Sequence, residues 1–142
     1  MKFWDTSALL PLLVDEPGGR RLRQLLIGDP SMLVWWCSRV EIASAIARRE
    51  REGRLKTNEA NVAFDALQQL ALSWEEIAPY ELIRDIAQRL LRTHPLRAAD
   101  SLQLAAALLA ADGEPATLDF MCLDNRLNEA ARREGFKLGA LT

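Results

Sequence analysis

The chain has 142 residues, of which 49% are hydrophobic and 27% are charged, so it can bury one ordinary core but is too short for two domains. Its 18 Lys and Arg residues against 20 Asp and Glu give a formal charge of −2, which excludes attraction of nucleic acid by net charge. Binding of RNA would therefore need a local basic face.

The N-terminal part alternates between strand and helix patterns. We predict a strand over residues 2–5, a brief apolar helix over 8–14, a helix over 20–28 and a strand over 32–36. The polar residues Thr6 and Ser7 open the first of these helices, so a strand passes directly into a helix at Asp5.

The middle of the chain is expected to be mainly helical. We predict helices over 38–52, 57–72 and 79–93, with a short strand over 74–77. Ser38 is the expected N-cap of the first helix, which places Glu41 in its first turn. Thr57 or Asn58 is expected to cap the second, and the second and third helices are expected to form a helical layer.

The C-terminal part repeats the alternation. We predict a helix over 97–111, a strand over 117–123, a helix over 124–134 and a strand over 136–138. The first helix is rich in Ala and Leu and nearly uncharged except for Asp100, so it should be packed on most of its circumference. Strands alternating with helices indicate a single α/β sandwich domain over 1–142 with a mostly parallel sheet.

Composition also limits the location of the protein. Cys37 and Cys122 lie far apart without a second nearby thiol, which argues against a zinc site and a disulfide scaffold and favours the cytoplasm. Asp5 interrupts the apolar start, so no signal peptide is expected. The low-charge run over 101–111 is far shorter than the roughly 20 residues that span a bilayer, so no membrane segment is expected.

Four acidic residues occupy positions where a ligand site can form. Asp5 and Asp124 follow predicted strands, and ligands of open parallel sheets bind outside the carboxyl ends of strands. Glu41 and Asp100 begin helices among apolar neighbours and should be drawn inward. Like charges ~4 Å apart cost about 4 kcal/mol at an effective dielectric near 20, and a divalent cation relieves that repulsion. Oxygen ligands alone suit Mg²⁺ or Mn²⁺.

Helix capping is the ordinary alternative for each acid taken singly. Asp is a good N-cap, which would account for Asp5 and Asp124, and a first-turn acid such as Glu41 or Asp100 favours the helix dipole. Capping does not explain why four acids should converge in a fold that puts two of them at strand ends.

Four segments resemble, in order, the motifs of PIN domains, specifically the bacterial VapC toxins: WDTSALL (4–10), VEIASA (40–45), LRAADSLQLA (96–105) and LDNRLNEAA (123–131). The resemblance covers nearly the whole chain. It implies a three-layer sandwich with a five-stranded parallel sheet and a Mg²⁺- or Mn²⁺-dependent endoribonuclease activity. It also implies a homodimer and a cognate VapB-like antitoxin whose C-terminal segment crosses the active site.

The same resemblance assigns the site residues. Asp5, Glu41, Asp100 and Asp124 match the family's acidic quartet, which would hold metal, activate a bound water and stabilise charge on the phosphate. Ser7 matches a hydroxyl near the metal. The fourth motif departs from its relatives, because Cys122 stands where they have Thr or Ser, and thiols donate hydrogen bonds weakly. Asn128 is therefore an alternative to Asp124.

The side chains expected to contact RNA are basic. The principal ones lie in the later part of the helix that contains Glu41 and in the third and fourth motifs. Arg48, Arg49, Arg97 and Arg126 are the principal candidates, with Arg20, Arg21, Arg51, Arg54 and Lys56 beyond them. A solvated helix face explains interleaved arginines and glutamates equally well. Trp4, Trp35, Trp36 and Trp74 could stack bases, although Trp4 and Trp35 fit the core or a dimer contact better.

A phosphatase, a receiver domain and a binding module compete with this interpretation. A haloacid-dehalogenase-like phosphatase needs a second Asp two residues after the first, where this chain has Ser7. A response-regulator receiver needs an Asp at the middle strand and a Lys on the last strand, and this chain has neither in place. His94, the one histidine, has no nucleophile motif beside it and is expected at the surface or in a cap. An inactive PIN fold that binds RNA or protein remains the non-enzymatic alternative.

Overall fold

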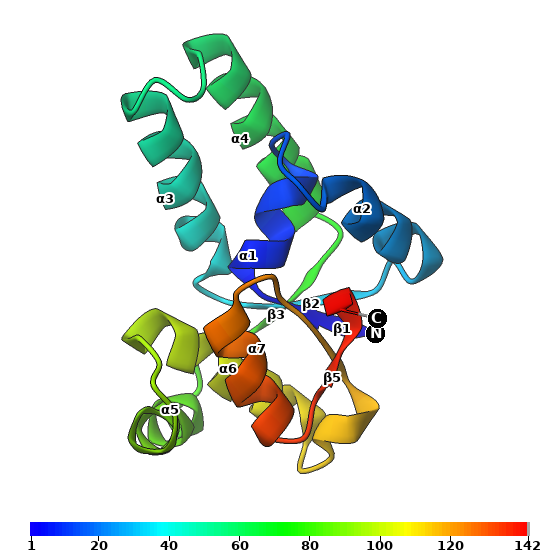
Figure 1. Ribbon diagram of the computed structural model, residues 1–142, viewed down its shortest axis with the longest axis vertical. Coiled ribbons are helices and arrows are strands. Elements are labelled where there is room, and N and C mark those ends of the chain that lie inside the picture. The colour runs from blue at the N-terminus through cyan, green and yellow to red at the C-terminus, as the bar shows by residue number, and fades with distance from the viewer. Residues whose placement is uncertain (142) are drawn as a thin grey trace.

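The computed structural model describes residues 1–141, which form a central sheet between two layers of helices (Figure 1). All five strands are parallel and lie in the order β3-β2-β1-β4-β5. Their bounds are Lys2–Trp4 (β1), Met32–Trp35 (β2), Glu75–Ile77 (β3), Asp119–Met121 (β4) and Lys137–Leu138 (β5). The predicted three-layer α/β sandwich with a five-stranded sheet is confirmed.

The helices that connect these strands follow the predicted order. They are α1 (Thr6–Leu9), α2 (Gly19–Gly28), α3 (Ser38–Arg51), α4 (Thr57–Ala71), α5 (Glu81–Thr93), α6 (Ala98–Ala111) and α7 (Asn125–Arg133). Short 3₁₀ segments cover Leu10–Leu12, Pro115–Thr117 and Gly139–Leu141. Within residues 1–141, none of the helices combines the length and the apolar character required to cross a bilayer.

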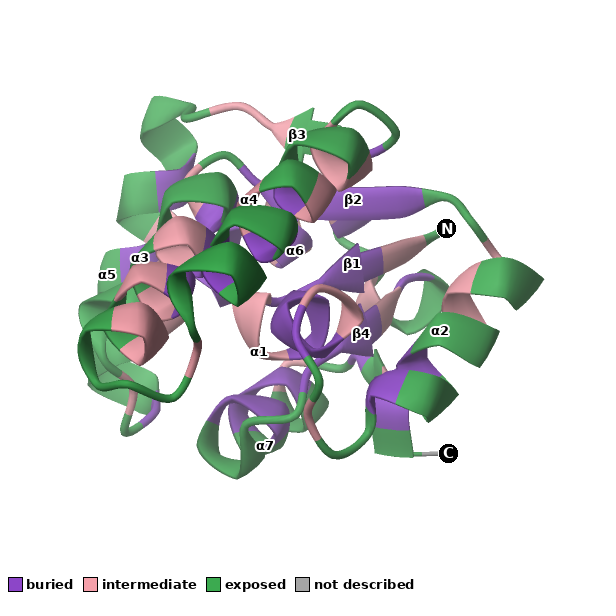
Figure 2. Cartoon of the chain, turned by 90° about the horizontal axis from the view of Figure 1, so that it is seen from above, coloured by how far each residue is buried: buried purple, intermediate pink, exposed green. Residues whose placement is uncertain are grey.

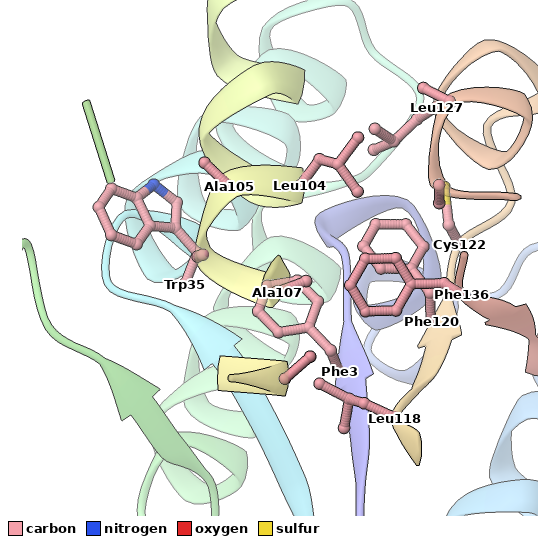
Figure 3. Close-up of a cluster of buried hydrophobic side chains, with 14 of the residues drawn as sticks. Phe3, Trp35, Leu104, Ala105, Ala107, Leu118, Phe120, Cys122, Leu127 and Phe136 are labelled. Atoms are coloured by element: carbon pink, nitrogen blue, oxygen red, sulfur yellow. The ribbon is translucent and has the colours of Figure 1, made fainter. Parts of the chain in front are cut away.

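Alternation along the strands divides the interior into two apolar cores. Phe3 and Phe120 point toward α5, α6 and α7, whereas Trp4 and Met121 point toward α1 to α4. The rings of Phe3 and Phe120 stack with centroids 5.6 Å apart, and Trp35 lies in the same cluster (Figure 3). Figure 2 shows that β2 and most of β1 and β4 are buried among the helices, whose outer faces are exposed, whereas the edge strand β3 is largely exposed. The core positions expected for Trp4 and Trp35 are confirmed.

The prediction that the helices over 57–72 and 79–93 form one layer is wrong. Residues of α4 pack into the core that contains Trp4, and residues of α5 pack into the core that contains Phe3. The physical reason is the strand order. The chain moves outward from β2 to β3 and then returns past β2 and β1 to β4. Because crossovers are right-handed, opposite directions of travel put their helices on opposite faces.

Two predicted helix caps are also wrong. Cys37, not Ser38, is the N-cap of α3, and the Ser38 hydroxyl instead accepts a hydrogen bond from Gln103 at 3.0 Å. The N-cap of α4 is Lys56 rather than Thr57 or Asn58, and its N–H donates to the Glu59 carboxylate at 2.8 Å. A tertiary partner and a neighbouring acid replace the expected side-chain caps.

Two element boundaries differ from prediction for local reasons. The first helix begins at Thr6 and passes into a 3₁₀ turn at Leu10, because Pro11 has no N–H with which to continue an α-helix. The strand predicted over 117–123 is shortened to β4. The Thr117 hydroxyl donates to the Glu114 carbonyl at 2.7 Å and fixes a 3₁₀ turn ahead of the strand.

Candidate active site

The four predicted acids meet at the carboxyl edge of the sheet. Asp5 follows β1 and Asp124 lies three residues after β4, and these two strands are neighbours. Glu41 and Asp100 lie in the first turns of α3 and α6. A cleft of about 1020 Å³ is lined by Glu41, Asp100 and Asp124, while Asp5 is only 5% exposed and lies outside that lining. Its charge nevertheless raises the pKa of Glu41, so it lies within electrostatic reach.

Asp5 is held by one of its two oxygens. Oδ2 accepts the backbone N–H of Ser7 at 3.0 Å, the Ser7 hydroxyl at 2.6 Å and the Cys122 thiol at 3.6 Å. Burial raises the pKa of Asp5 despite the Ser7 hydrogen bonds, and the charge of Asp100 raises it further. In residues 1–141 no hydrogen bond to Oδ1 is present. Capping α1 therefore uses one oxygen and leaves the other for a ligand.

Ser7 joins the ends of two strands. Its hydroxyl donates to Asp5 and accepts the backbone N–H of Leu123 at 2.9 Å. Cys122, the departure from the family pattern, also lies between the acids, because its sulfur accepts the N–H of Asp124 at 3.3 Å. Burial and the neighbouring Asp5 raise the pKa of this thiol well above its ordinary range, which keeps it neutral. Ser7 thus orients the Asp5 carboxylate.

Two polar side chains donate hydrogen bonds to Glu41. The Gln103 amide donates to Oε2 at 3.2 Å, and the Thr6 hydroxyl donates to Oε1 at 3.3 Å. Burial raises the pKa of Glu41 to about 7, and the charges of Asp5 and Asp100 act in the same direction. Near neutral pH, a divalent cation beside Glu41 would favour its ionised form.

Asp100 and Asp124 interact electrostatically. Burial raises the pKa of Asp100 and the charge of Asp124 raises it further, while Arg97 and Arg126 oppose the shift. Oδ1 of Asp124 accepts the Leu127 N–H at 2.9 Å and caps α7. Asp5 and Asp124 therefore do cap helices. The charges of neighbouring acids nevertheless add to the effect of burial on the pKa values of Asp5, Glu41 and Asp100, so the carboxylates also interact with one another.

Asn128, the alternative to Asp124, lies outside the lining of the cleft. Its buried amide donates to the Cys122 carbonyl at 2.8 Å and ties α7 to the end of β4. Its Oδ1 is buried and has no hydrogen-bond partner among the described residues. The contacts of Asn128 are those of a residue that fixes the position of the Asp124 turn.

The cleft is an open edge rather than a closed metal cage. Among residues 1–141 no three Asp, Glu, His or Cys side chains are gathered tightly enough to enclose an ion by themselves. The donors that do face one another are all carboxylates, which are the ligands that Mg²⁺ and Mn²⁺ prefer. Such sites complete their coordination with water and substrate phosphate, so the donor set fits a loosely held hard cation.

Three of the four principal arginine candidates line the same cleft. All three are exposed: Arg48 lies on α3, Arg97 directly before α6 and Arg126 on α7. Arg49 is different, because it forms an ion pair with Glu16 and donates to the Ala45 carbonyl at 3.3 Å. Arg49 is thus already paired within the protein and lies outside the lining of the cleft, and its contact with RNA stays a prediction.

Sequence reasoning missed the polar network beneath Glu41. The Nε2 of the fully buried Gln103 lies 3.1 Å from the Thr6 hydroxyl and 3.0 Å from the Ser38 hydroxyl. A signal was present, since Gln103 is an amide in an otherwise apolar stretch one turn after Asp100. His94 is the C-cap of α5 as expected, but it is buried, with Nε2 2.7 Å from Glu134.

Comparisons with known proteins agree with this architecture. The family model described as PIN domain matches residues 2–132. Two Mycobacterium tuberculosis proteins, Ribonuclease VapC45 and Ribonuclease VapC49, are each 31% identical over 139 residues, covering 96% of this chain and 92% of their own length. The matched region therefore spans nearly the whole of this chain and of each relative.

Solved structures with low sequence identity share the fold. The crystal structure of FitAcB from Neisseria gonorrhoeae has a TM-score of 0.68 at 18% identity and covers 99% of both chains. The structure of FitAB bound to an IR36 DNA fragment has a TM-score of 0.67 at 17% identity, covering 97% of this chain and 93% of that one. The sheet order, the acids at its carboxyl edge and the matched span together establish that this chain belongs to the PIN domain family.

Proposed function

We propose that this protein is a Mg²⁺- or Mn²⁺-dependent endoribonuclease, the toxin of a VapBC-type toxin–antitoxin system. The observation that carries the proposal is the convergence of Asp5, Glu41, Asp100 and Asp124 on one edge, where burial and mutual repulsion raise the pKa values of the first three. Relatives named as VapC ribonucleases support RNA as the substrate.

The carboxylates position the reaction rather than attack the phosphate. Asp5 and Asp100 would hold the cation, with Glu41 and Asp124 as further oxygen ligands or as acceptors for bound water. When bound, the metal ion would lower the pKa of a coordinated water and neutralise charge on the phosphate. Ser7 and Gln103 would keep Asp5 and Glu41 in fixed orientations.

The arginines supply the complementary charge for RNA. Arg48, Arg97 and Arg126 surround the acids, and within the described residues none of them has a carboxylate within ion-pair distance of 4 Å. Their guanidinium groups are thus available to a phosphate backbone. These arginines form the local basic surface that RNA binding needs in a protein whose net charge is −2.

The same acidic cleft suits an inhibitory protein partner. We propose a VapB-like antitoxin whose basic side chain enters the site, since a cation there would replace the charge of the metal. We also propose that the protein acts as a homodimer. Size-exclusion chromatography with light scattering, with and without the coexpressed antitoxin, measures both assemblies.

The direct test is cleavage of a panel of RNAs by the wild type and by Asp5→Asn. Wild-type protein with Mg²⁺ is expected to cut internal phosphodiester bonds, EDTA should abolish cutting, and Asp5→Asn should be inactive. The matched control is Asp112→Asn, because Asp112 ends α6 outside the cleft and its left-handed backbone accepts Asn. Equal cutting by wild type and Asp5→Asn would reject the assignment of the acidic site, whereas no cutting by the wild type would support the alternative of an inactive PIN-fold binding module.

The phosphatase alternative has less support. Ser7 occupies the position of its second Asp, and here its hydroxyl is committed to Asp5 and to Leu123. Release of inorganic phosphate from a phosphomonoester, unaffected by Asp100→Asn, would revive that alternative.

A further inference from the structure

Trp36 stands apart from the other tryptophans of the chain. Trp4, Trp35 and Trp74 are all buried, whereas Trp36 is 53% exposed. Its backbone is not loose, because the Trp36 N–H donates to the Ile77 carbonyl at 3.2 Å and continues the pairing of β2 with β3. A fixed backbone thus presents a large apolar ring to solvent.

The exposed ring belongs to the lining of the acidic cleft. Trp36 and the exposed Val40 form an apolar stretch beside Glu41. The same lining contains Arg48, Arg97 and Arg126, so an aromatic face, three guanidinium groups and the acids share one hollow. Single-stranded nucleic acid is bound by this combination, in which bases stack on aromatic rings and cations track the phosphates.

We propose that Trp36 is a stacking platform for an unpaired nucleobase of the RNA, next to the phosphate held at the acids. This inference rests on the proposed ribonuclease function and narrows its substrate to single-stranded segments. A paired base is stacked within its helix and cannot present its face to the indole, so a duplex would lose this contact. Trp36 is a binding residue here and takes no part in the chemical step.

Charge complementarity favours RNA over an apolar protein partner at this position. An apolar partner covering Trp36 would bring its own surface against the charged groups of the cleft and remove them from water without pairing them. An RNA strand pairs its phosphates with the arginines while its base covers the ring. A nucleotide of the RNA therefore satisfies both the apolar and the charged part of this surface, which an apolar protein partner does not.

Tryptophan fluorescence provides a readout that does not depend on catalysis. Since Trp36 is the one exposed tryptophan in the part of the chain that the structure describes, neutral acrylamide should quench it in preference to the others. In an Asp100→Asn background, a short single-stranded RNA of mixed sequence should shield Trp36, bringing the quenching down to that of the Trp36→Phe protein. The same RNA annealed to its complement should shield it far less.

Kinetics provide the second readout. Trp36→Ala should raise KM for single-stranded RNA roughly 5- to 150-fold with little change in kcat, because stacking stabilises ground and transition states alike. Trp36→Phe should restore part of the loss. The control is Tyr80→Ala, which removes a 61% exposed aromatic ring at the start of α5, outside the cleft.

The outcomes separate this inference from the proposed function. Suppose that the wild type cuts RNA, that Trp36→Ala has an unchanged KM and that RNA does not reduce the quenching of Trp36. The stacking role of Trp36 is then wrong, while the proposed ribonuclease function is upheld. If RNA shields Trp36 but no RNA is cut, stacking is upheld and the enzymatic proposal fails. Shielding that depends on protein concentration without RNA would assign Trp36 to a protein interface and overturn the inference.

Discussion

Ser7 has the shortest hydrogen bond to a proposed metal ligand, 2.6 Å from its hydroxyl to Asp5. Partners of this kind typically change metal affinity 10- to 100-fold when they are removed. We therefore expect Ser7→Ala to weaken Mn²⁺ binding by about that factor and to raise the metal concentration needed for cleavage. Ser44→Ala is the control, since Ser44 is an exposed serine in the cleft lining. Unchanged affinity in Ser7→Ala would deny Ser7 an orienting role.

Gln103 determines how readily Glu41 ionises. Its amide donates to the Glu41 carboxylate and thereby lowers a pKa that burial has raised. Gln103→Met removes that donor, so the pKa of Glu41 should rise above about 7 and the acid limb of the pH–rate profile should move to higher pH. The pKa is measured by NMR titration of the metal-free protein.

A matched control for Gln103→Met is Gln88→Met, which changes an exposed glutamine on α5. A profile that moves equally in both variants, or a Glu41 pKa that falls in Gln103→Met, would contradict the assigned role.

Residue types and order predict which acids matter but not what holds them. Asp5, Glu41, Asp100 and Asp124 could be named from strand ends, helix starts and family motifs. The network of Gln103, Thr6 and Ser38 could not, because its members are up to 97 residues apart and none of their local patterns requires a contact.

At the scale of elements, the stack of Phe3 on Phe120 joins β1 to β4 and so fixes the spacing of the turns that carry Asp5 and Asp124. Phe120→Ala should destabilise the protein by about 3–5 kcal/mol, because the fully buried ring leaves a cavity. Urea denaturation measures the change. Leu72→Ala, at an 82% exposed position, should stay within about 0.5 kcal/mol of wild type. A loss as small for Phe120→Ala would contradict the packing described.

Element types were predictable from periodicity, whereas the side of the sheet was not. The apolar spacing over 57–72 and 79–93 correctly predicts α4 and α5. Their separation onto opposite faces depends on β3 lying at the edge beside β2, which is a property of the whole strand order. The prediction of the helix caps was wrong for a similar reason, because the Ser38 hydroxyl accepts a hydrogen bond from Gln103 instead of capping its own helix.

At the scale of the whole molecule, the acidic edge should make the metal-free protein less stable as pH rises. The pKa of Glu41 is about 7 in the folded state against an ordinary 4.5, and those of Asp5 and Asp100 are raised as well. A raised pKa means that folding favours the protonated form. The contribution of these acids to stability is therefore full below pH ~4.5, and that of Glu41 is lost as pH increases through about 7.

Thermal or urea unfolding across that pH window checks this expectation. Glu41→Gln should flatten the dependence, and Mg²⁺ should restore stability at the upper end because it binds the ionised folded state. Stability of the metal-free wild type that rises between pH 5 and 7 and does not change with Mg²⁺ would contradict this electrostatic account.

The central claim is that acids distant in sequence form one site for a doubly charged cation, and Mn²⁺ titration followed by electron paramagnetic resonance tests it most directly. The account predicts saturable Mn²⁺ binding that is displaced by Mg²⁺, greatly weakened in Asp5→Asn and in Asp100→Asn, and retained in Asp112→Asn. Binding of equal strength in all four proteins, or no saturable binding in the wild type, would contradict it.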